Sequence, residues 1–349
     1  MSSDLLVTKC FAILSGEEPA LARAEFESIL HLANFEAELT WNQNLVVFNT
    51  GKHNLAFLLF RAAMIKEAGY IIAESSALNE DIEWIPEKKL ASSIQPTETF
   101  CVRTQSLVSK GMNEYRQQIT NLLGTKIKHL TKAKIDAKRP NAKILVLLTS
   151  NGVKVCRSYK SDSRKKLMNK NSAKKPFFHP SMMNAQLARV MCNLAGVMSG
   201  KIAYDPFSGS GGILLELAAL GAKTIGMDLN WRQLMGSKLN LIHQKHTLFS
   251  LIQGDARVPP IAQHFCDSIV TDPPYGRASS TRGSEATNLV TEFLAAIPKI
   301  LKPNGMLCIA GSNKMRIPEI ANDLGFKCAY HIPIRVHSGL IRDIVTIRV

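Results

Sequence analysis

The sequence predicts an α/β protein in which an α+β amino-terminal region precedes a doubly wound, mostly parallel sheet. From Lys201 onwards, strand-like and helix-like segments alternate to the end of the chain, and crossovers of this length join parallel strands. The last two strands are joined by a short polar loop around Gly339 without a helix, which indicates an antiparallel pair at a sheet edge. Before residue 160 strands and helices also alternate, and Asn151-Gly152 is a strong hairpin signal.

The composition is that of a two-domain protein outside the membrane. A chain of 349 residues with 46% hydrophobic and 20% charged residues can bury two cores. No apolar run approaches the ~20 residues of a membrane span, and Met1-Ser2-Ser3-Asp4 lacks the features of a signal peptide. We therefore expect a cytoplasmic protein with no membrane partner. The seven cysteines are scattered and never form Cys-x-x-Cys pairs, which argues against a disulfide framework and against a metal site.

The positive charge of the chain is concentrated in one segment. The net charge is +15, yet residues 1–100 carry 7 basic against 14 acidic residues, and residues 176–349 carry 17 against 11. Residues 101–175 hold 19 Lys and Arg against 3 Asp and Glu, a balance of +16. A solvated face is the simpler interpretation of a short basic run, but this concentration favours a polyanion partner. An anionic membrane is less favoured, because no amphipathic helix with exposed aromatics accompanies the charges.

Apolar periodicity and turn residues predict the individual elements. In the amino-terminal half we expect strands at 5–14, 45–49, 100–103, 144–149 and 153–159 and helices at 20–33, 55–70 and 114–123. In the other half we expect strands at 202–206, 223–227, 249–253, 267–271, 306–310, 327–336 and 343–349 and helices at 182–194, 212–220, 231–246, 288–301 and 318–324. Between them, the Lys-, Arg-, Ser- and Asn-rich stretch Ser158–Lys175 predicts an exposed linker and a domain boundary.

The order of these elements favours one class of fold. Five parallel strands followed by an antiparallel pair give a seven-stranded mixed sheet with a terminal antiparallel hairpin. This is the Rossmann-like arrangement of a class I methyltransferase domain, and the terminal hairpin distinguishes it from a dehydrogenase.

A glycine-rich turn predicts a cofactor site after the first parallel strand. The turn is Asp205-Pro206-Phe207-Ser208-Gly209-Ser210-Gly211-Gly212, and its glycines let the backbone approach a ligand closely. Alone it is equally compatible with a tight turn, but Asp228-Leu229 and Asp255-Ala256 follow the next two strands at matching positions. In nucleotide-binding folds an acidic residue there accepts hydrogen bonds from ribose hydroxyls. We expect Asp228 to hold the ribose, Asp255 the adenine amino group, and Asp205 to lie beneath the methionine moiety of S-adenosyl-L-methionine.

The fourth parallel strand ends in the candidate catalytic loop, Asp272-Pro273-Pro274-Tyr275. Consecutive prolines hold the backbone extended and cannot donate hydrogen bonds, so their carbonyls stay free to accept. Asp272 and the Pro273 carbonyl would accept the two protons of an exocyclic amine and orient its nitrogen for attack. Tyr275 would stack on the substrate base, which must first leave any nucleic-acid helix to reach the methyl group. A rigid turn without a catalytic role is the simpler interpretation, but the loop lies at the predicted ligand-binding end of the sheet, which disfavours it. The loop alone does not decide whether the methylated base is guanine or adenine.

These motifs resemble those of the archaeal tRNA guanine-N2-methyltransferases that act on the tenth nucleotide of tRNA. The similarity runs along nearly the whole chain, although Ser208 and Ser210 stand where relatives commonly have Cys and Thr. Besides the cofactor turn, it is carried by Lys175-Pro176-Phe177-Phe178-His179-Pro180, Leu187-Ala188-Arg189, Asp272–Arg277 with Ser279-Ser280, Phe100-Cys101-Val102-Arg103, the Gly124 region and Ile135-Asp136-Ala137-Lys138-Arg139-Pro140.

The resemblance implies a domain organisation and further site residues. It implies a ferredoxin-like domain over residues 1–55, a THUMP RNA-binding domain over 56–157, a basic linker over 158–178 and a methyltransferase domain over 179–349. Phe178 and His179 would join the cofactor site. The basic side chains that we expect to contact RNA are Arg103, Lys126, Lys128, Lys132, Lys134, Lys138, Arg139, Arg164, Lys165 and Lys166.

The resemblance also implies the reaction and its partners. The enzyme would methylate the N2 amine of guanosine 10 in tRNA, leaving S-adenosyl-L-homocysteine, and one or two transfers would give N2-methylguanosine or N2,N2-dimethylguanosine. A small zinc-binding activator protein would be a partner. The alternatives are the same chemistry at another tRNA or ribosomal RNA position, an adenine N6 methyltransferase, and a catalytically silent RNA-binding protein. The intact Asp272 argues against the last of these.

Overall fold

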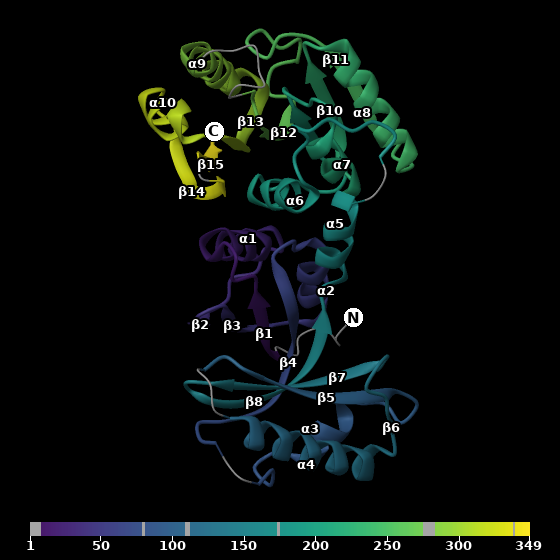
Figure 1. The fold of residues 1–349 in the computed structure, drawn as a ribbon. Helices are drawn as coiled ribbons and strands as arrows, with labels where there is room; N and C mark the ends of the chain where they lie inside the picture. The colour runs from purple at the N-terminus through teal and green to yellow at the C-terminus, as the bar shows by residue number, and fades with distance from the viewer. Residues whose placement is uncertain (1–7, 79–80, 109–111, 173–174, 275–282, 338) are drawn as a thin grey trace. The chain divides into compact units, whose positions relative to one another are not determined.

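The chain folds into two compact units, each described separately. A computed structural model describes residues 8–78, 81–108, 112–172, 175–274, 283–337 and 339–349 (Figure 1). The amino-terminal unit contains the described residues of Met1–Ser15, Phe35–Leu59 and Ile65–Ser161, and the carboxyl-terminal unit contains those of Gly16–Asn34, Phe60–Met64 and Asp162–Val349. No helix in the described ranges is both long and apolar enough to cross a bilayer.

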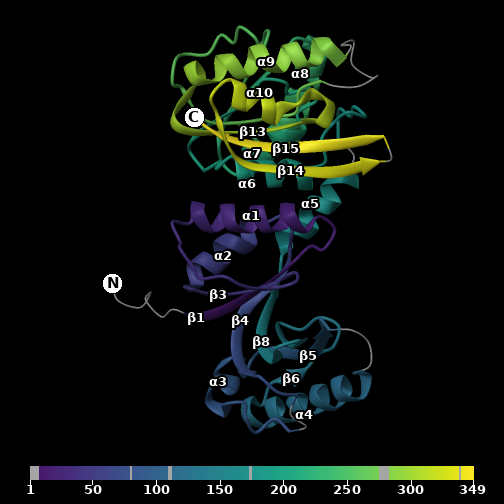
Figure 2. The same cartoon turned by 90° about the vertical axis from the view of Figure 1, so that its left-hand side faces the viewer.

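The amino-terminal unit is built on one sheet that, among the described residues, has eight strands in the order β2-β3-β1-β4-β8-β7-β5-β6. β5 pairs in parallel with β6 and β7, and the other neighbours are antiparallel. Its strands are β1 Thr8–Leu14, β2 Thr40–Asn42, β3 Leu45–Thr50, β4 Ile65–Ser75, β5 Thr99–Ser106, β6 Lys134–Ile135, β7 Ala142–Thr149 and β8 Gly152–Lys160, with helices α2 Lys52–Arg61, α3 Glu87–Ser92 and α4 Asn113–Thr131. The long strands β4 and β8 connect the β1–β3 part of this unit to the part that carries α3 and α4 (Figure 2).

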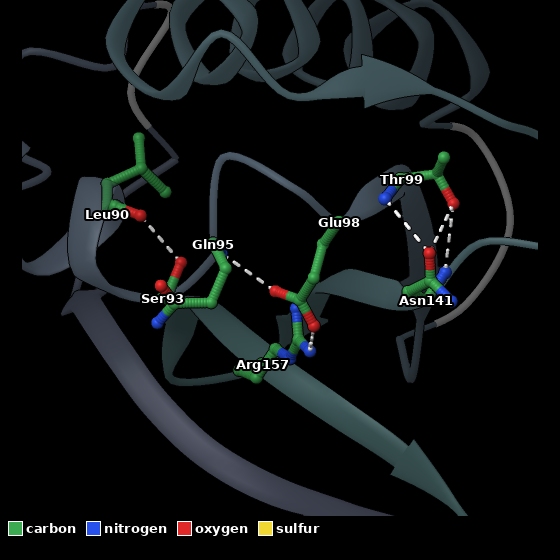
Figure 3. Close-up of polar contacts among 7 residues, drawn as sticks. All are labelled: Leu90, Ser93, Gln95, Glu98, Thr99, Asn141 and Arg157. Atoms are coloured by element: carbon green, nitrogen blue, oxygen red, sulfur yellow. Dashed lines mark hydrogen bonds and ion pairs between the residues drawn. The ribbon is translucent and has the colours of Figure 1, made fainter.

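A set of polar contacts fixes the entry into β5 (Figure 3). The Glu98 carboxylate accepts hydrogen bonds from the Gln95 N–H at 2.8 Å and from Arg157 Nη2 at 2.8 Å. Burial opposes ionisation of Glu98, but these two donors outweigh it and hold the pKa of Glu98 below its usual value. Asn141 Oδ1 accepts from both the backbone N–H and the hydroxyl of Thr99, at 3.1 and 3.0 Å. These contacts tie the start of β5 to Asn141, which directly precedes the neighbouring strand β7, and to Arg157 of β8.

The expected helix over residues 55–70 is wrong in its second half. Helix α2 ends at Arg61, and Ile65–Ser75 is the strand β4. The run is apolar on both sides, a pattern that fits a buried strand as well as a helix. Gly69 carries the missed signal: a Cβ atom there would lie 1.9 Å from the Arg157 carbonyl oxygen of β8, so the close approach of the two backbones requires glycine.

The carboxyl-terminal unit contains the expected seven-stranded mixed sheet. In the part of the chain that the structure describes, the strand order is β11-β10-β9-β12-β13-β15-β14. The first five strands in this order are parallel, and β15 pairs antiparallel with both β13 and β14. The strands are β9 Ile202–Asp205, β10 Lys223–Asp228, β11 Phe249–Gln253, β12 Cys266–Thr271, β13 Leu301–Ser312, β14 Lys327–His337 and β15 Leu340–Arg348. The terminal antiparallel hairpin is therefore confirmed.

Helices cover both faces of this sheet (Figure 1). α6, α7 and α8 lie in sequence on one face, and α9 and α10 pack on the other around Phe293, Leu294 and Ile317. The helices of this unit are α1 Pro19–Leu32, α5 Asp162–Ser172, α6 Ala185–Leu194, α7 Gly212–Ala219, α8 Trp231–His243, α9 Gly283–Ile300 and α10 Ile317–Asp323.

Helix α5 occupies much of the stretch that was expected to be an irregular linker. Lys and Arg are good helix formers, so a highly charged composition does not exclude a helix. Leu167 gives α5 a buried contact, since its side chain is only 2% exposed. Of the stretch Ser158–Lys175, which the composition predicts to be an exposed linker, residues 158–160 end β8 and Asp162–Ser172 form α5.

A buried polar network holds α1 in the carboxyl-terminal unit. The Glu25 carboxylate is fully buried and accepts hydrogen bonds from the backbone N–H groups of Ala63 and Met64 at 2.9 and 2.8 Å. It also accepts from Asn193 Nδ2 of α6 at 2.8 Å, while Arg61 Nε donates to Asn193 Oδ1 at 3.1 Å. These bonds explain why segments from the first 64 residues are part of the same unit as α6.

We predict opposite effects on stability for two glycine substitutions in the amino-terminal unit. Gly69→Ala should lower the free energy of unfolding by about 3 kcal/mol, because β4 and β8 would have to separate. Gly124→Ala, the control within α4, meets no atom within 4 Å and should raise it by about 0.5–1 kcal/mol. Urea denaturation followed by circular dichroism measures both, and equal stabilities would contradict the packing of β4 on β8.

Candidate active site

The predicted site residues gather at one edge of the carboxyl-terminal sheet. Asp205 is the last residue of β9, Asp228 is the last of β10, and Asp272 follows β12 directly. Because these strands are parallel, their carboxyl ends share one edge, where open α/β sheets bind ligands. Asp255 lies two residues beyond β11 at the same edge.

The glycine-rich turn between β9 and α7 has two glycines with positive φ, and they have different roles. At Gly211, with φ +88°, a Cβ atom would lie 2.8 Å from the Ser237 Cβ of α8, so glycine is needed for packing. At Gly209, with φ +50°, a Cβ would meet nothing within 4 Å. The backbone at Gly209 therefore borders open space, which a ligand can approach closely.

The side chains of this turn are mostly buried, and they fit a polar ligand. Pro206 is buried, and the Phe207 ring packs edge-on against Phe293 with centroids 5.4 Å apart. The hydroxyls of Ser208 and Ser210 are buried and have no hydrogen-bond partner among the described residues. Buried polar groups without partners are costly unless a ligand or water satisfies them. The turn thus offers both open space and hydrogen-bonding capacity, as a nucleotide-type cofactor requires.

Asp205 joins the cofactor turn to the strand that carries the catalytic loop. Its carboxyl group is 1% exposed and accepts a hydrogen bond from Thr271 Oγ1 at 2.7 Å and from the Phe207 N–H at 3.2 Å. Burial, together with the nearby charges of Asp228 and Asp272, raises the pKa of Asp205 to about 8. The sequence analysis did not identify Thr271 as a site residue. The available signal was a hydroxyl residue at the end of an otherwise apolar strand.

The two other carboxylates predicted to contact the cofactor have different surroundings. Asp228 Oδ2 accepts from the Gly209 N–H at 2.8 Å, and Oδ1 accepts from the Asn230 N–H at 2.8 Å. Asp228 therefore orders the cofactor turn. Asp255 forms an ion pair with Arg257, in which Asp255 Oδ2 accepts hydrogen bonds from Nε at 3.0 Å and from Nη2 at 2.5 Å. These bonds hold the pKa of Asp255 below its usual range. Of their neighbours, Leu229 is exposed and Ala256 is buried.

The segment before α6 is bound to the cofactor turn through a residue that the sequence did not reveal. Asn240 of α8 accepts a hydrogen bond from the Phe177 N–H at 3.1 Å and donates to the Phe177 carbonyl at 2.8 Å. It also donates to the Ser210 carbonyl at 3.0 Å. Phe178 is 68% exposed, and His179 Nδ1 lies 2.7 Å from Ser181 Oγ. A polar residue at a buried helix position was the signal for Asn240.

The described part of the catalytic loop presents one charged and two rigid residues. Asp272 is mostly buried, Pro273 is buried and Pro274 is exposed. The guanidinium of Arg342, from β15, lies 3.7 Å from Asp272 Oδ2. Tyr275 lies outside the described residues, so its predicted stacking role stays a prediction.

The expected RNA-binding residues differ in how free their charges are. Five of them are exposed on the segment that runs from the end of α4 through β6 into the following loop: Lys128, Lys132, Lys134, Lys138 and Arg139. By contrast, the Lys126 ammonium forms ion pairs with Glu83 and Glu87 at 3.5 and 3.2 Å.

The remaining basic side chains of this set lie on β5 and α5. Arg103 Nη2 donates to the Ala137 carbonyl at 2.8 Å, which supports the same exposed loop. On α5, Lys165 and Lys166 are exposed, while the Arg164 side chain is 17% exposed and lies 3.7 Å from Glu17.

The fold and the site define a class I methyltransferase. A seven-stranded sheet with a terminal antiparallel hairpin carries an acidic, glycine-rich cofactor turn and an Asp-Pro-Pro loop at the same edge. Residues 172–343 match the family described as RMKL-like, methyltransferase domain.

The similarity to known proteins extends along nearly the whole chain. A tRNA (guanine(10)-N2)-dimethyltransferase from Methanothermobacter thermautotrophicus is 30% identical over 338 residues, which cover 95% of this chain and 97% of that protein. The relative of the same name from Methanocaldococcus jannaschii is 26% identical over 95% of this chain and 97% of that protein. The chain belongs to the tRNA (guanine(10)-N2)-dimethyltransferase family.

Solved structures support the fold over the same extent. The crystal structure of TrmN from Thermus thermophilus has a TM-score of 0.57 and 16% identity, covering 97% of this chain and 99% of that one. A possible methylase from Clostridium difficile 630 has a TM-score of 0.52 and 16% identity, covering 98% of each chain. At these identities the likeness concerns the fold alone.

Asp205 should make stability depend on pH in a defined direction. Its pKa is about 8 in the folded chain and about 4 in an unfolded one, so folding favours the protonated form. Stability relative to Asp205→Asn should be greatest below about pH 4 and fall as the pH rises to about 8. Chemical denaturation of both proteins across this range measures the difference, and asparagine keeps the acceptor for Thr271. A constant difference would show that Asp205 ionises normally.

Proposed function

We propose that this chain methylates the exocyclic N2 amine of guanosine 10 in tRNA, using S-adenosyl-L-methionine as methyl donor. The observation that carries the proposal is the position of Asp272-Pro273 directly beyond β12, one residue from Thr271, which is hydrogen-bonded to the cofactor-turn residue Asp205. Full-length similarity to tRNA (guanine(10)-N2)-dimethyltransferases supports the target base and nucleotide. One transfer gives N2-methylguanosine, and a second gives N2,N2-dimethylguanosine.

The cofactor turn and its neighbours would hold the methyl donor. When bound, S-adenosyl-L-methionine supplies an electrophilic methyl group on a sulfonium and leaves as S-adenosyl-L-homocysteine. The open backbone at Gly209 and the buried hydroxyls of Ser208 and Ser210 are available to it. Asp228 has accepting capacity beyond its two backbone bonds for ribose hydroxyls, since each carboxylate oxygen accepts more than one. Asp255 would contact the adenine amino group while it remains paired with Arg257.

The catalytic loop would orient the amine. An exocyclic NH2 on a purine is a weak nucleophile, because its lone pair is delocalised into the ring. The Asp272 carboxylate and the Pro273 carbonyl would each accept one N–H, which fixes the nitrogen for attack on the methyl carbon. Little base strength is needed, because the methylated, positively charged nitrogen loses a proton readily. Tyr275 would stack on the extruded base.

The amino-terminal unit would bind the tRNA. We propose a ferredoxin-like segment over residues 1–55, a THUMP segment over 56–157 and a linker over 158–178, of which residues 16–34, 60–64 and the linker from residue 162 belong to the carboxyl-terminal unit. Exposed basic side chains from the end of α4, β6 and the loop after it form a group of positive charges, here called the α4 patch: Lys128, Lys132, Lys134, Lys138 and Arg139. Asp136 accepts hydrogen bonds from the N–H groups of Lys138 and Arg139 and so shapes the loop that presents them. Such a patch gains affinity for phosphates by counterion release.

The cellular setting is also part of the proposal. A tRNA substrate is consistent with a cytoplasmic location. A small zinc-binding activator protein, which the family resemblance implies, would be a partner of the methyltransferase domain. Mixing purified protein with such a partner and measuring the methylation rate tests this.

The purified chain should methylate a tRNA transcript with guanosine at position 10 and leave a transcript with adenosine there unlabelled. The measurement is incorporation of labelled methyl groups, followed by nucleoside analysis for N2-methylguanosine and N2,N2-dimethylguanosine. Equal labelling of both transcripts would contradict the position, and N6-methyladenosine would contradict the base.

The control for this assay is Asp272→Ala. The variant should lose methylation and keep most of its affinity for S-adenosyl-L-methionine, because Asp272 is assigned to the amine rather than to the cofactor. Titration calorimetry measures that affinity. Retained turnover would refute the role of Asp272.

The α4 patch should determine the salt dependence of tRNA binding. Replacing Lys128, Lys132 and Lys134 together by Gln should weaken binding and lower the slope of log K against log salt by about 2–3, roughly one for each phosphate that is no longer neutralised. Lys126→Gln is the matched control: its ammonium is already paired with Glu83 and Glu87, so the slope should hardly change. An equal slope for the triple variant and the wild type would show that these three lysines do not contact tRNA phosphates.

A further inference from the structure

Strand β15 brings a cation to the edge of the sheet where the catalytic loop begins. β15 runs antiparallel to β13, so its amino end meets the carboxyl ends of the parallel strands. In the register of this pair, Ile309 lies opposite Val345 and Ser312 opposite Arg342, while Ile309 also pairs with Thr271 of β12. Arg342 is therefore three residues beyond the level of Thr271, on the side of the sheet edge where Asp272 lies.

The contact between Arg342 and Asp272 is largely shielded from solvent. Arg342 Nη2 lies 3.7 Å from Asp272 Oδ2, and the two side chains are 18% and 14% exposed. An ion pair in such surroundings is screened less than one at the surface. A separation of 3.7 Å exceeds hydrogen-bond length. The guanidinium can thus stabilise the charge of Asp272. This contact is not a hydrogen bond, so it does not itself use the carboxylate oxygen that would accept an N–H of the substrate amine.

The site needs such a cation because carboxylates accumulate at this edge. Burial is the main cause of the raised pKa of Asp205, and the nearby charges of Asp228 and Asp272 add to it. Like charges at short range disfavour ionisation of one another. A carboxylic acid that keeps its proton would lose accepting capacity toward the substrate amine.

The neighbouring acid on β15 does not neutralise Arg342. Successive side chains of a strand point to opposite faces, so Asp343 is directed away from the face of Arg342. Asp343 is 5% exposed, and its carboxylate lies 3.2 Å from His331 Nε2 of β14. The two adjacent charged residues of β15 thus serve separate contacts, one to the hairpin partner and one to the catalytic loop.

We propose that Arg342 is a positioning residue for the methyl transfer: it keeps the Asp272 carboxylate ionised and directed at the substrate amine. The inference rests on the proposed function, because it assigns Asp272 to that amine. It assigns a role in the reaction to a residue of β15, the last strand in the sequence, which carries none of the sequence motifs.

The test compares Arg342→Gln, Arg342→Lys and the control Arg348→Gln, at the exposed far end of the same strand. For Arg342→Gln we expect kcat to fall by roughly 100-fold, the loss that follows misplacement of a reacting group, with the affinity for S-adenosyl-L-methionine nearly unchanged. Arg342→Lys should recover part of kcat, since it restores the charge, and Arg348→Gln should behave as wild type. The acidic limb of the kcat–pH profile should move to higher pH in Arg342→Gln, because the carboxylate loses a neighbouring cation.

Thermal unfolding of all three variants separates a folding defect from a positioning defect. Wild-type kcat in Arg342→Gln, or equal kcat losses in the Gln and Lys variants, would overturn the inference. If Arg342→Gln does not fold, the kcat of Arg342→Lys and its dependence on pH decide whether Arg342 positions Asp272. If the wild type methylates the adenosine transcript instead, the guanosine assignment fails, but the ratio of variant to wild-type kcat on that transcript still decides the role of Arg342.

Discussion

The active site depends on one hydrogen bond, from Thr271 Oγ1 to the buried carboxyl group of Asp205 at 2.7 Å. Asp205 ends β9 and begins the glycine-rich turn, while Thr271 ends β12 and is followed by Asp272. β9 and β12 are neighbours in the sheet, so this bond joins the cofactor turn and the catalytic loop at the level where the strands end. Methyl transfer requires donor and acceptor to be held within about 3–3.5 Å of each other. A short link between the two loops is a direct way to meet that requirement.

A second buried network joins segments that are far apart in the sequence within the carboxyl-terminal unit. Glu25, Arg61 and Asn193 are all buried and bonded to one another or to adjacent backbone. The chain therefore passes between the two units several times before residue 162. A protein truncated at the start of α5 would lack Glu25 and Arg61, and the buried Asn193 amide would no longer have them to bond with. Unsatisfied buried polar groups cost about 1–3 kcal/mol each, so the isolated carboxyl-terminal half should be less stable than its compact fold suggests.

The sequence predicted what local patterns determine and missed what distant contacts determine. Alternating strands and helices, the glycine-rich turn and the Asp-Pro-Pro loop are contiguous, and the sheet with its terminal hairpin was confirmed. Asp205 and Asp228 end their strands and Asp272 directly follows its strand, while their roles stay predictions. The apolar run at 55–70 was misassigned, because only the pairing of β4 with β1 and β8 selects strand over helix there. Asn240 and Arg342 act on segments 63 and 70 residues away in the chain, and no local pattern identifies such partners.

The electrostatic balance of the ligand-binding edge links these observations. Three carboxylates meet there, but burial favours a protonated Asp205 near neutral pH, and Arg342 lies beside Asp272. Protonation of Asp205 and the cation beside Asp272 both reduce the repulsion among these carboxylates. Asp228 keeps its position through two backbone N–H groups rather than through a cation. A protonated Asp205 can ionise when positive charge arrives nearby, because a close cation stabilises the anion. The net charge of this edge therefore depends on the protonation of Asp205 as well as on the contact between Arg342 and Asp272.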